Sequence, residues 1–134
     1  MSWIKTLFGQ KTESQDFDAA KVNFANQQAR LVAQTIQRRA DGDMSDKQFA
    51  DTMARISNDV LIDPTPGATG YFGDALSAQI SSLQNLPSDV AQSIAGEMRI
   101  LRESIANFPD QASQAFTAFT RKTSAYLSKA IRDT

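Results

Sequence analysis

The segment from Ser88 to Phe108 shows the most regular pattern of apolar and polar positions in the chain. Its larger apolar side chains recur every three or four residues: Val90, Ile94, Met98, Leu101, Ile105 and Phe108. This is the 3.6-residue period of an α-helix with one buried face, whereas a half-buried strand alternates at every second residue. Ala91, Ala95 and Ile100 widen the apolar surface, so we expect neighbouring helices on two sides of this central helix.

The N-terminal half of the chain shows the same period over a longer stretch. We expect a helix from Asp16 to about Ala40, capped by Ser14 or Asp16, with Arg38 and Arg39 near its negative C-terminal end. Its expected buried face consists of Phe17, Ala20, Phe24, Ala25, Leu31, Val32, Ala33 and Ile36. The opposite side is rich in glutamine and asparagine, as is typical of a helix surface that faces water.

Local turn chemistry predicts where this long helix stops and the next begins. Gly42 is expected to end it in the left-handed conformation that glycine adopts after many helices. Ser45 and Gln48 have the spacing of a capping box, in which each side chain bonds the backbone N–H of the other. The helix that follows should bury Phe49, Met53, Ile56 and Val60.

Two further helices complete the second half of the chain. One is expected from about Asp74 to Leu86, with Phe72, Leu76, Ile80, Leu83 and Leu86 on one side. Ser88 is the expected N-cap of the central helix, and so short a connection makes these two helices antiparallel neighbours. After Pro109, a last helix should turn inward Ala112, Phe116, Phe119, Thr123, Tyr126, Leu127 and Ile131.

Residues 63–70 are the clear linker of the chain, because Pro64 and Pro66 prevent a helix and Pro66-Gly67 suits a turn. One interpretation is a crossover on the surface. The other is a binding loop in which Pro64, Pro66, Tyr71 and Phe72 contact a partner, since loops on rigid scaffolds often carry function.

These elements predict an all-α fold, a compact bundle of about five helices. We expect a short N-terminal amphipathic segment at residues 1–12 and a single bundle domain at residues 13–134. Within that domain a helical hairpin at 13–62 is joined through the linker 63–70 to an antiparallel three-helix group at 71–134.

The N-terminal segment has three interpretations. Residues 2–8 place apolar side chains on one side of a two-turn helix that Gly9 would end. The segment could fold back onto its own bundle, dock onto another protein, or lie in a membrane interface with its aromatic rings among the headgroups and its cations near anionic lipid. The residues concerned are Trp3, Ile4, Lys5, Leu7, Phe8 and Lys11. So small an apolar surface gives only weak attachment, so lasting recruitment needs oligomerisation or a second contact.

A second cationic group lies near the C-terminus: Arg121, Lys122, Lys129 and Arg132. One interpretation is compensation of the negative end of the last helix, on a face that water solvates. The other is a weak contact with anionic lipid or with an acidic partner.

Composition narrows the chemistry. The chain has 134 residues, is 41% apolar and 22% charged, and carries a net charge of −1 with its basic residues dispersed, which does not favour nucleic-acid binding. It has no cysteine and no histidine, which removes thiolate chemistry, zinc–sulfur sites and the commonest general base. The turn at residues 41–46 departs from a calcium loop, because Asp46 stands where that loop needs glycine and Thr52 where it needs glutamate. We expect no cofactor, no metal and no small-molecule substrate.

Two function classes follow from these features. The first is a non-catalytic interaction or adaptor module that binds another protein or itself, located in the cytoplasm and peripherally at an inner membrane face through its N-terminal helix. The second is a small structural or secreted helical component, either an assembly subunit or an effector delivered without a cleaved signal. No apolar run approaches the length of a membrane-spanning helix.

Overall fold

The computed structural model describes the backbone of residues 2–61 and 68–133, and side chains within residues 19–61, 71–108 and 110–131. Helices make up almost all of this part of the chain, and it contains no strand. The elements are α1 (Ser2–Ala40), α2 (Asp46–Leu61), α3 (Ala68–Ala78), the 3-10 helix η1 (Gln79–Asn85), α4 (Ser88–Asn107), the 3-10 helix η2 (Pro109–Gln111) and α5 (Ala112–Asp133). The expected all-α bundle is confirmed.

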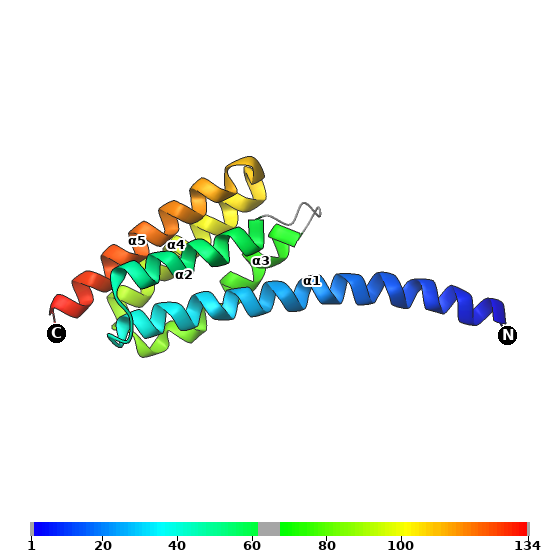
Figure 1. The fold of residues 1–134 in the computed structure, drawn as a ribbon, viewed down its shortest axis with the longest axis horizontal. Coiled ribbons are helices and arrows are strands. Elements are labelled where there is room, and N and C mark those ends of the chain that lie inside the picture. Colours follow the sequence, from blue (N-terminus) through cyan, green and yellow to red (C-terminus); the bar gives the residue numbers. More distant parts are fainter. Residues whose placement is uncertain (1, 62–67, 134) are drawn as a thin grey trace.

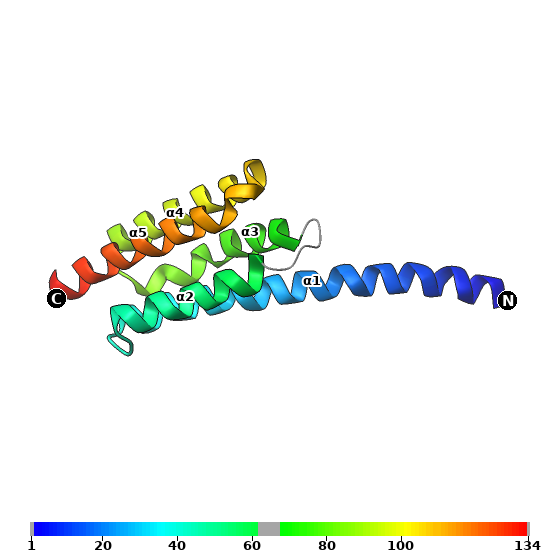
Figure 2. The same cartoon turned by 45° about the horizontal axis from the view of Figure 1, so that its top comes forward.

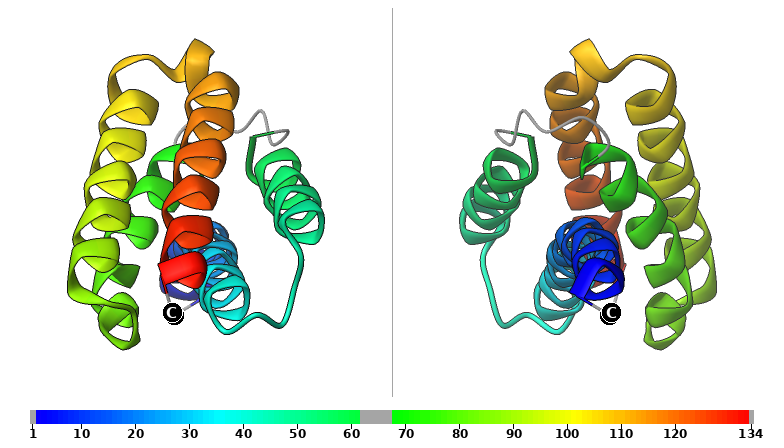
Figure 3. Two further views of the ribbon diagram at one scale, coloured as in Figure 1. Left: turned by 90° about the vertical axis from the view of Figure 1, so that its left-hand side faces the viewer. Right: turned by 90° about the vertical axis from the view of Figure 1, so that its right-hand side faces the viewer.

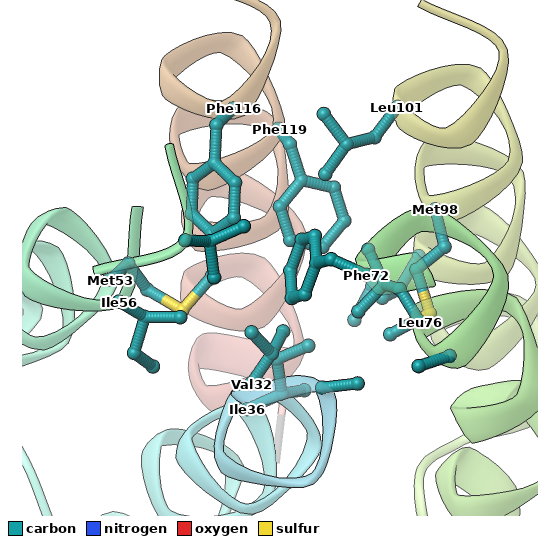
Figure 4. Close-up of a cluster of buried hydrophobic side chains, with 14 of the residues drawn as sticks. Val32, Ile36, Met53, Ile56, Phe72, Leu76, Met98, Leu101, Phe116 and Phe119 are labelled. Atoms are coloured by element: carbon teal, nitrogen blue, oxygen red, sulfur yellow. The ribbon is translucent and has the colours of Figure 1, made fainter. Parts of the chain in front are cut away.

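The five α-helices surround one core in the spatial order α1, α2, α5, α4, α3, with α3 returning to α1 (Figure 3). Buried side chains of all five belong to a single apolar cluster, so the hairpin and the three-helix group share one core. At its centre Phe72 of α3 stacks on Phe116 of α5 with ring centroids 5.9 Å apart. Phe119 meets Phe116 edge-on at 6.0 Å, and side chains of α1, α2 and α4 pack around these rings (Figure 4).

The turn between α1 and α2 follows the expected chemistry. Gly42 has φ +82°, and the backbone N–H of Gly42 and of Asp43 donate to the carbonyls of Arg39 (3.1 Å) and Arg38 (2.9 Å). This pattern is the Schellman motif, which satisfies the last carbonyls of a helix. The capping box of α2 is also confirmed, because Ser45 N–H donates to Gln48 Oε1 (2.9 Å) and Gln48 N–H to Ser45 Oγ (3.2 Å).

The inner faces of α2 and α4 were largely predicted correctly. All four expected residues of α2 are buried, as are Ile94, Met98, Leu101 and Ile105 of α4. Ile100 and Phe108 were placed wrongly, since they are 52% and 59% exposed. Phe108 follows the last helical residue with φ −137°, which turns it away from the helical repeat.

Helix α1 differs from the expectation in two ways. The predicted break at Gly9 is absent, because α1 runs uninterrupted from Ser2 to Ala40, so Ser14 and Asp16 lie inside the helix rather than at its cap. A single glycine costs a helix only about 1 kcal/mol, so it does not by itself end one. The expected division between residues 12 and 13 therefore also falls within α1.

The buried face of α1 was predicted only in part, since Ala25, Val32, Ala33 and Ile36 are buried as expected. Ala20, Phe24 and Leu31 are exposed, whereas the buried residues are Ala25, Gln28, Ala29, Val32, Ala33, Thr35 and Ile36. The small residues Ala25 and Ala29 let α1 approach its neighbours closely, and the larger side chains of Phe24 and Leu31 lie on another side of the helix.

Helix α3 begins at Ala68 rather than at Asp74, and the expected single helix passes into η1 at Gln79. Gly73 lies inside α3 beside Arg102 of α4, and a Cβ at this position would make ordinary van der Waals contact with the Cγ of Arg102 at 3.5 Å. Ser88 is the first residue of α4 and not its N-cap, because Pro87 holds the N-cap position and no side chain caps that end.

The N-terminal half of α1 extends beyond the other helices (Figures 1 and 2). Within residues 19–40, the first buried residue is Ala25. The part of α1 before Ala25, residues 2–24, is called the α1 arm below. Its length is about 34 Å at the helical rise of 1.5 Å per residue.

Candidate functional site

A groove of about 610 Å³ runs between α2 and α5. Its lining comes from the two helices alone: Asp46, Lys47, Ala50, Ala54, Ser57 and Asn58 of α2, and Ser113, Phe116, Thr117, Thr120, Arg121 and Ser124 of α5. The two helices therefore touch along their inner sides, where Phe49 and Phe116 are buried, and leave their outer edges apart.

Short side chains at helical spacing create the groove. On α2 they are Ala50, Ala54 and Ser57, and on α5 they are Ser113, Thr117, Thr120 and Ser124. Residues three and four apart lie on one side of a helix, so each row forms one wall. The ring of Phe116 lies in the groove lining with only 1% of its surface exposed.

Several hydroxyl groups of the groove already have partners. Thr117 Oγ1 donates to the carbonyl of Ser113 (3.0 Å) and Thr120 Oγ1 to that of Phe116 (3.1 Å). Ser124 Oγ donates to Asp46 Oδ1 (3.4 Å). Since these bonds satisfy the hydroxyls, the middle of the groove is more apolar than its composition indicates, and suits an apolar side chain better than a polar ligand.

The end of the groove at the start of α2 is held by Asp46. Arg39 donates to Asp46 Oδ1 from Nη2 (2.8 Å) and from Nε (2.9 Å), and Ser128 Oγ donates to the same oxygen (3.2 Å). The hydrogen bond from Arg39 lowers the pKa of Asp46 below its ordinary value, against an opposing effect of desolvation, and the bonds from Ser128 and Ser124 lower it further. These contacts join α1, α2 and α5 at one point.

Two cations flank the same end of the groove. Lys47 of α2 and Arg121 of α5 are exposed, and neither forms an ion pair with any residue whose side chain is described. Along the length of the groove, Ala50 and Ala54 lie at the middle, and Ser57, Asn58 and Ser113 lie at the far end. The groove is thus cationic at one end, apolar along its middle and uncharged polar at the other end.

The other predicted basic residues lie apart from Arg121. Lys122 faces α4, where its Nζ stands 3.8 Å from Glu97 Oε2. Lys129 borders a separate hollow of about 280 Å³ between α4 and α5. The side chain of Arg132 is outside the described residues. Among the members of this predicted group whose side chains are described, Arg121 alone lines the groove.

Tyr126 lies beside Lys129 in the same hollow, and its hydroxyl donates to Glu97 Oε1 (3.3 Å). Desolvation raises the pKa of Tyr126 above its ordinary value, and the negative charge of Glu97 raises it further. The Tyr126–Glu97 hydrogen bond ties α5 to α4.

The predicted binding-loop residues have different outcomes. The two predictions for Phe72 have opposite outcomes. Its place on the apolar face of a helix is confirmed, since it is fully buried within α3, and its role in a binding loop is wrong, because it belongs to the core. Tyr71 is half-buried against that core. Pro64 and Pro66 lie outside the described residues, so their proposed role stays a prediction.

The predicted N-terminal contact residues all lie in the α1 arm. Helix α1 includes Trp3, Ile4, Lys5, Leu7, Phe8 and Lys11, whose side chains are outside the described part of the structure. Their proposed contacts stay predictions.

An exposed apolar row on α1 was missed by sequence reasoning. Phe24 and Leu31 are 38% and 43% exposed and stand seven residues apart, which places them on one side of the helix. Ala20 is exposed on the same side. Phe17 precedes Phe24 by another seven residues in the sequence, and its side chain lies outside the described residues. We call Phe17, Ala20, Phe24 and Leu31 the α1 row. The spacing of these residues is clear in the sequence, but we expected them in the core.

Comparisons with family models, curated sequences and solved structures give no match. Among the residues described here, no three acidic, cysteine or histidine side chains gather where they could hold a metal ion. Within the same residues, no helix has the length and apolar character needed to cross a membrane.

Proposed function

We propose that this protein is a non-catalytic interaction module that the α1 arm attaches to another surface. The observation that carries this proposal is the position of the arm, which extends beyond the bundle, with none of residues 19–24 buried (Figure 1). Most of the stability of a helix in a protein comes from packing an apolar face, and residues 19–24 contribute no buried side chain to such a face. A role outside the bundle explains such a segment.

The first few residues of the arm favour a membrane interface as that surface. Trp3, Ile4, Leu7 and Phe8 supply apolar and aromatic groups, with Lys5 and Lys11 beside them in the sequence. Tryptophan and phenylalanine partition into the headgroup region, and lysines gain from the negative potential of anionic lipid. Residues 2–11 form fewer than three helical turns, so each copy binds weakly and reversibly.

Co-sedimentation with lipid vesicles tests this proposal on the full chain. The wild type should pellet with phosphatidylcholine vesicles that contain phosphatidylglycerol, and much less with phosphatidylcholine alone, because part of the attraction is electrostatic. The double variant Trp3→Ser/Phe8→Ser should bind the anionic vesicles at least about tenfold more weakly, since it loses two large apolar side chains.

A matched control uses exposed apolar residues elsewhere. Ile100→Ser/Phe108→Ser removes two exposed apolar side chains from α4 and its end, and should leave vesicle binding unchanged. Equal losses in the two double variants would show that binding does not depend on the arm. A wild-type chain that stays in the supernatant with anionic vesicles would refute the membrane part of the proposal.

A further inference from the structure

We infer that the groove between α2 and α5 receives the α1 arm of a second copy of this chain, with Phe17, Ala20 and Phe24 of the α1 row lying along the groove. The inference concerns residues 13–24 of the arm, which follow the segment proposed to meet lipid. It goes beyond the proposed function because it assigns a site for self-association, and it holds in the absence of any membrane.

Shape supports the inference first. Between Lys47 and Asn58 the α2 wall of the groove is 12 residues long, or about three helical turns. Residues 13–24 of the arm span the same length in one uninterrupted helix. Within that span Phe17, Ala20 and Phe24 have the spacing by which a helix anchors in a groove. The short side chains of Ala50 and Ala54 leave room for such anchors.

The charges of the arm and of the groove also support the inference. Residues 13–24 contain three acidic residues, Glu13, Asp16 and Asp18, all before Ala20, and one basic residue, Lys21. The groove carries Lys47 and Arg121, both exposed, at the end where α2 begins. In the arm the carboxylates lie N-terminal to the anchor residue Phe24, and in α2 Lys47 lies N-terminal to Ala54. Complementary charge therefore predicts that the incoming arm runs parallel to α2, with its acidic end beside the two cations.

The arm cannot reach the groove of its own chain without leaving its helical path. α1 and α2 are neighbours joined by a short turn, and the arm continues past the far end of α2 (Figure 2). It therefore points away from the α2–α5 groove of the same molecule. A second copy is the occupant that supplies both the apolar row and the acidic segment.

Such a contact would also strengthen attachment to a surface. Each copy brings one set of weakly binding N-terminal residues, and linking several copies raises their combined affinity without any new contact. The α1 row and the groove lie on different parts of the chain, so two copies can exchange arms or each arm can bind the next copy.

Sedimentation velocity over a concentration series, in buffer without lipid, tests the inference. The wild type should sediment as a dimer or larger at high concentration and as a monomer when dilute. Ala20→Glu changes the arm and Ala54→Glu changes the groove, and both positions are exposed, so the fold should persist. Each variant should raise the dissociation constant at least about tenfold, because the contact would bury an unpaired charge.

Two controls make these results specific. Ile100→Glu places the same charge on the exposed side of α4 and should associate like the wild type. Arg121→Glu removes a cation from the groove, and should weaken association and reduce its dependence on salt.

Mixing the two variants gives the sharpest result. Ala20→Glu keeps an intact groove and Ala54→Glu keeps an intact arm. At a concentration at which the wild type is associated, each variant alone should be largely monomeric, while an equimolar mixture forms a mixed pair. A wild type that remains a monomer at high concentration would overturn the inference. So would a mixture that stays monomeric, or an Ala54→Glu variant that associates normally, since the arms would then pair with each other.

Discussion

Replacing Phe72 with alanine tests whether α3 joins the two parts of the chain into one core. Phe72 is fully buried and stacks on Phe116, so the change leaves a cavity between α3, α5 and their neighbours. Core phenylalanine-to-alanine substitutions cost about 3–5 kcal/mol, from lost apolar transfer energy and the cavity that remains. A domain of this size is stable by about 5–15 kcal/mol, so this loss is a large part of the total.

Urea unfolding followed by far-ultraviolet circular dichroism measures the effect. With a dependence of about 2 kcal/mol per molar urea, the midpoint should fall by about 1.5–2.5 M, without a large change in the slope. The melting temperature should fall by about 10–20 °C.

Phe108→Ala is the matched control, because it makes the same chemical change at a residue that is 59% exposed. It should cost less than about 1 kcal/mol. If the two substitutions had equal effects, or if Phe72→Ala cost less than about 1 kcal/mol, Phe72 would not lie in the core, and the prediction that it belongs to a binding loop would return.

Three further predictions concern particular groups of the bundle. Thr123 Oγ1 is fully buried and has no hydrogen-bond partner among the described residues. Thr123→Val should therefore raise the free energy of unfolding by about 1 kcal/mol in thermal melts, and a decrease would show that the hydroxyl has a partner. Gly42→Ala should destabilise the protein by about 1–2 kcal/mol because the φ of Gly42 is +82°. Gly96→Ala should stabilise it by about 0.5–1 kcal/mol, because a Cβ at this position inside α4 meets open space. If chemical unfolding gave changes in stability of the same sign for both variants, this reasoning would be contradicted. Asp46 has a lowered pKa, so its ion pair contributes stability above the ordinary pKa near 3.8 and loses it as the pH falls through the folded-state pKa. The wild type should therefore lose more stability than Asp46→Asn on acidification. The difference should be less than about 1 kcal/mol, because the Asp46 side chain is 59% exposed. Parallel pH profiles of stability would refute a stabilising role of the ion pair.

Local sequence signals determined much of this fold. The spacing of apolar residues predicted the inner faces of α2 and α4, and the chemistry of Gly42, Ser45 and Gln48 predicted the turn between α1 and α2. Each of these signals is complete within a few residues. A helical period or a capping box needs no information about the rest of the molecule.

The errors arise where tertiary contacts choose between local alternatives. Helix α1 carries a row of small residues and a row of larger apolar ones, and the larger row gave the stronger apolar signal. The structure covers Ala25 and Ala29 and leaves Phe24 and Leu31 exposed, because neighbouring helices pack on the small side. Gly9 and Gly73 likewise lie inside helices, since one glycine weakens a helix by less than the rest of it contributes.

The groove could not be read from the sequence in the same way. Ala54 and Thr117 face each other only because α2 and α5 are neighbours in the bundle. Arg121 was predicted as a contact residue because of its charge, but nothing in the sequence indicates that Lys47 lies near it. Only the spatial order of the helices brings these two cations to one end of one groove.

The emission of Trp3, the single tryptophan of the chain, tests most directly whether the α1 arm stands away from its own bundle. In dilute buffer we expect the emission of a water-exposed indole that acrylamide quenches as efficiently as free tryptophan. Anionic vesicles should shift this emission to the blue and protect it from quenching. Emission that is already blue and protected in dilute buffer would place the arm against its own domain and contradict its role as an attachment element.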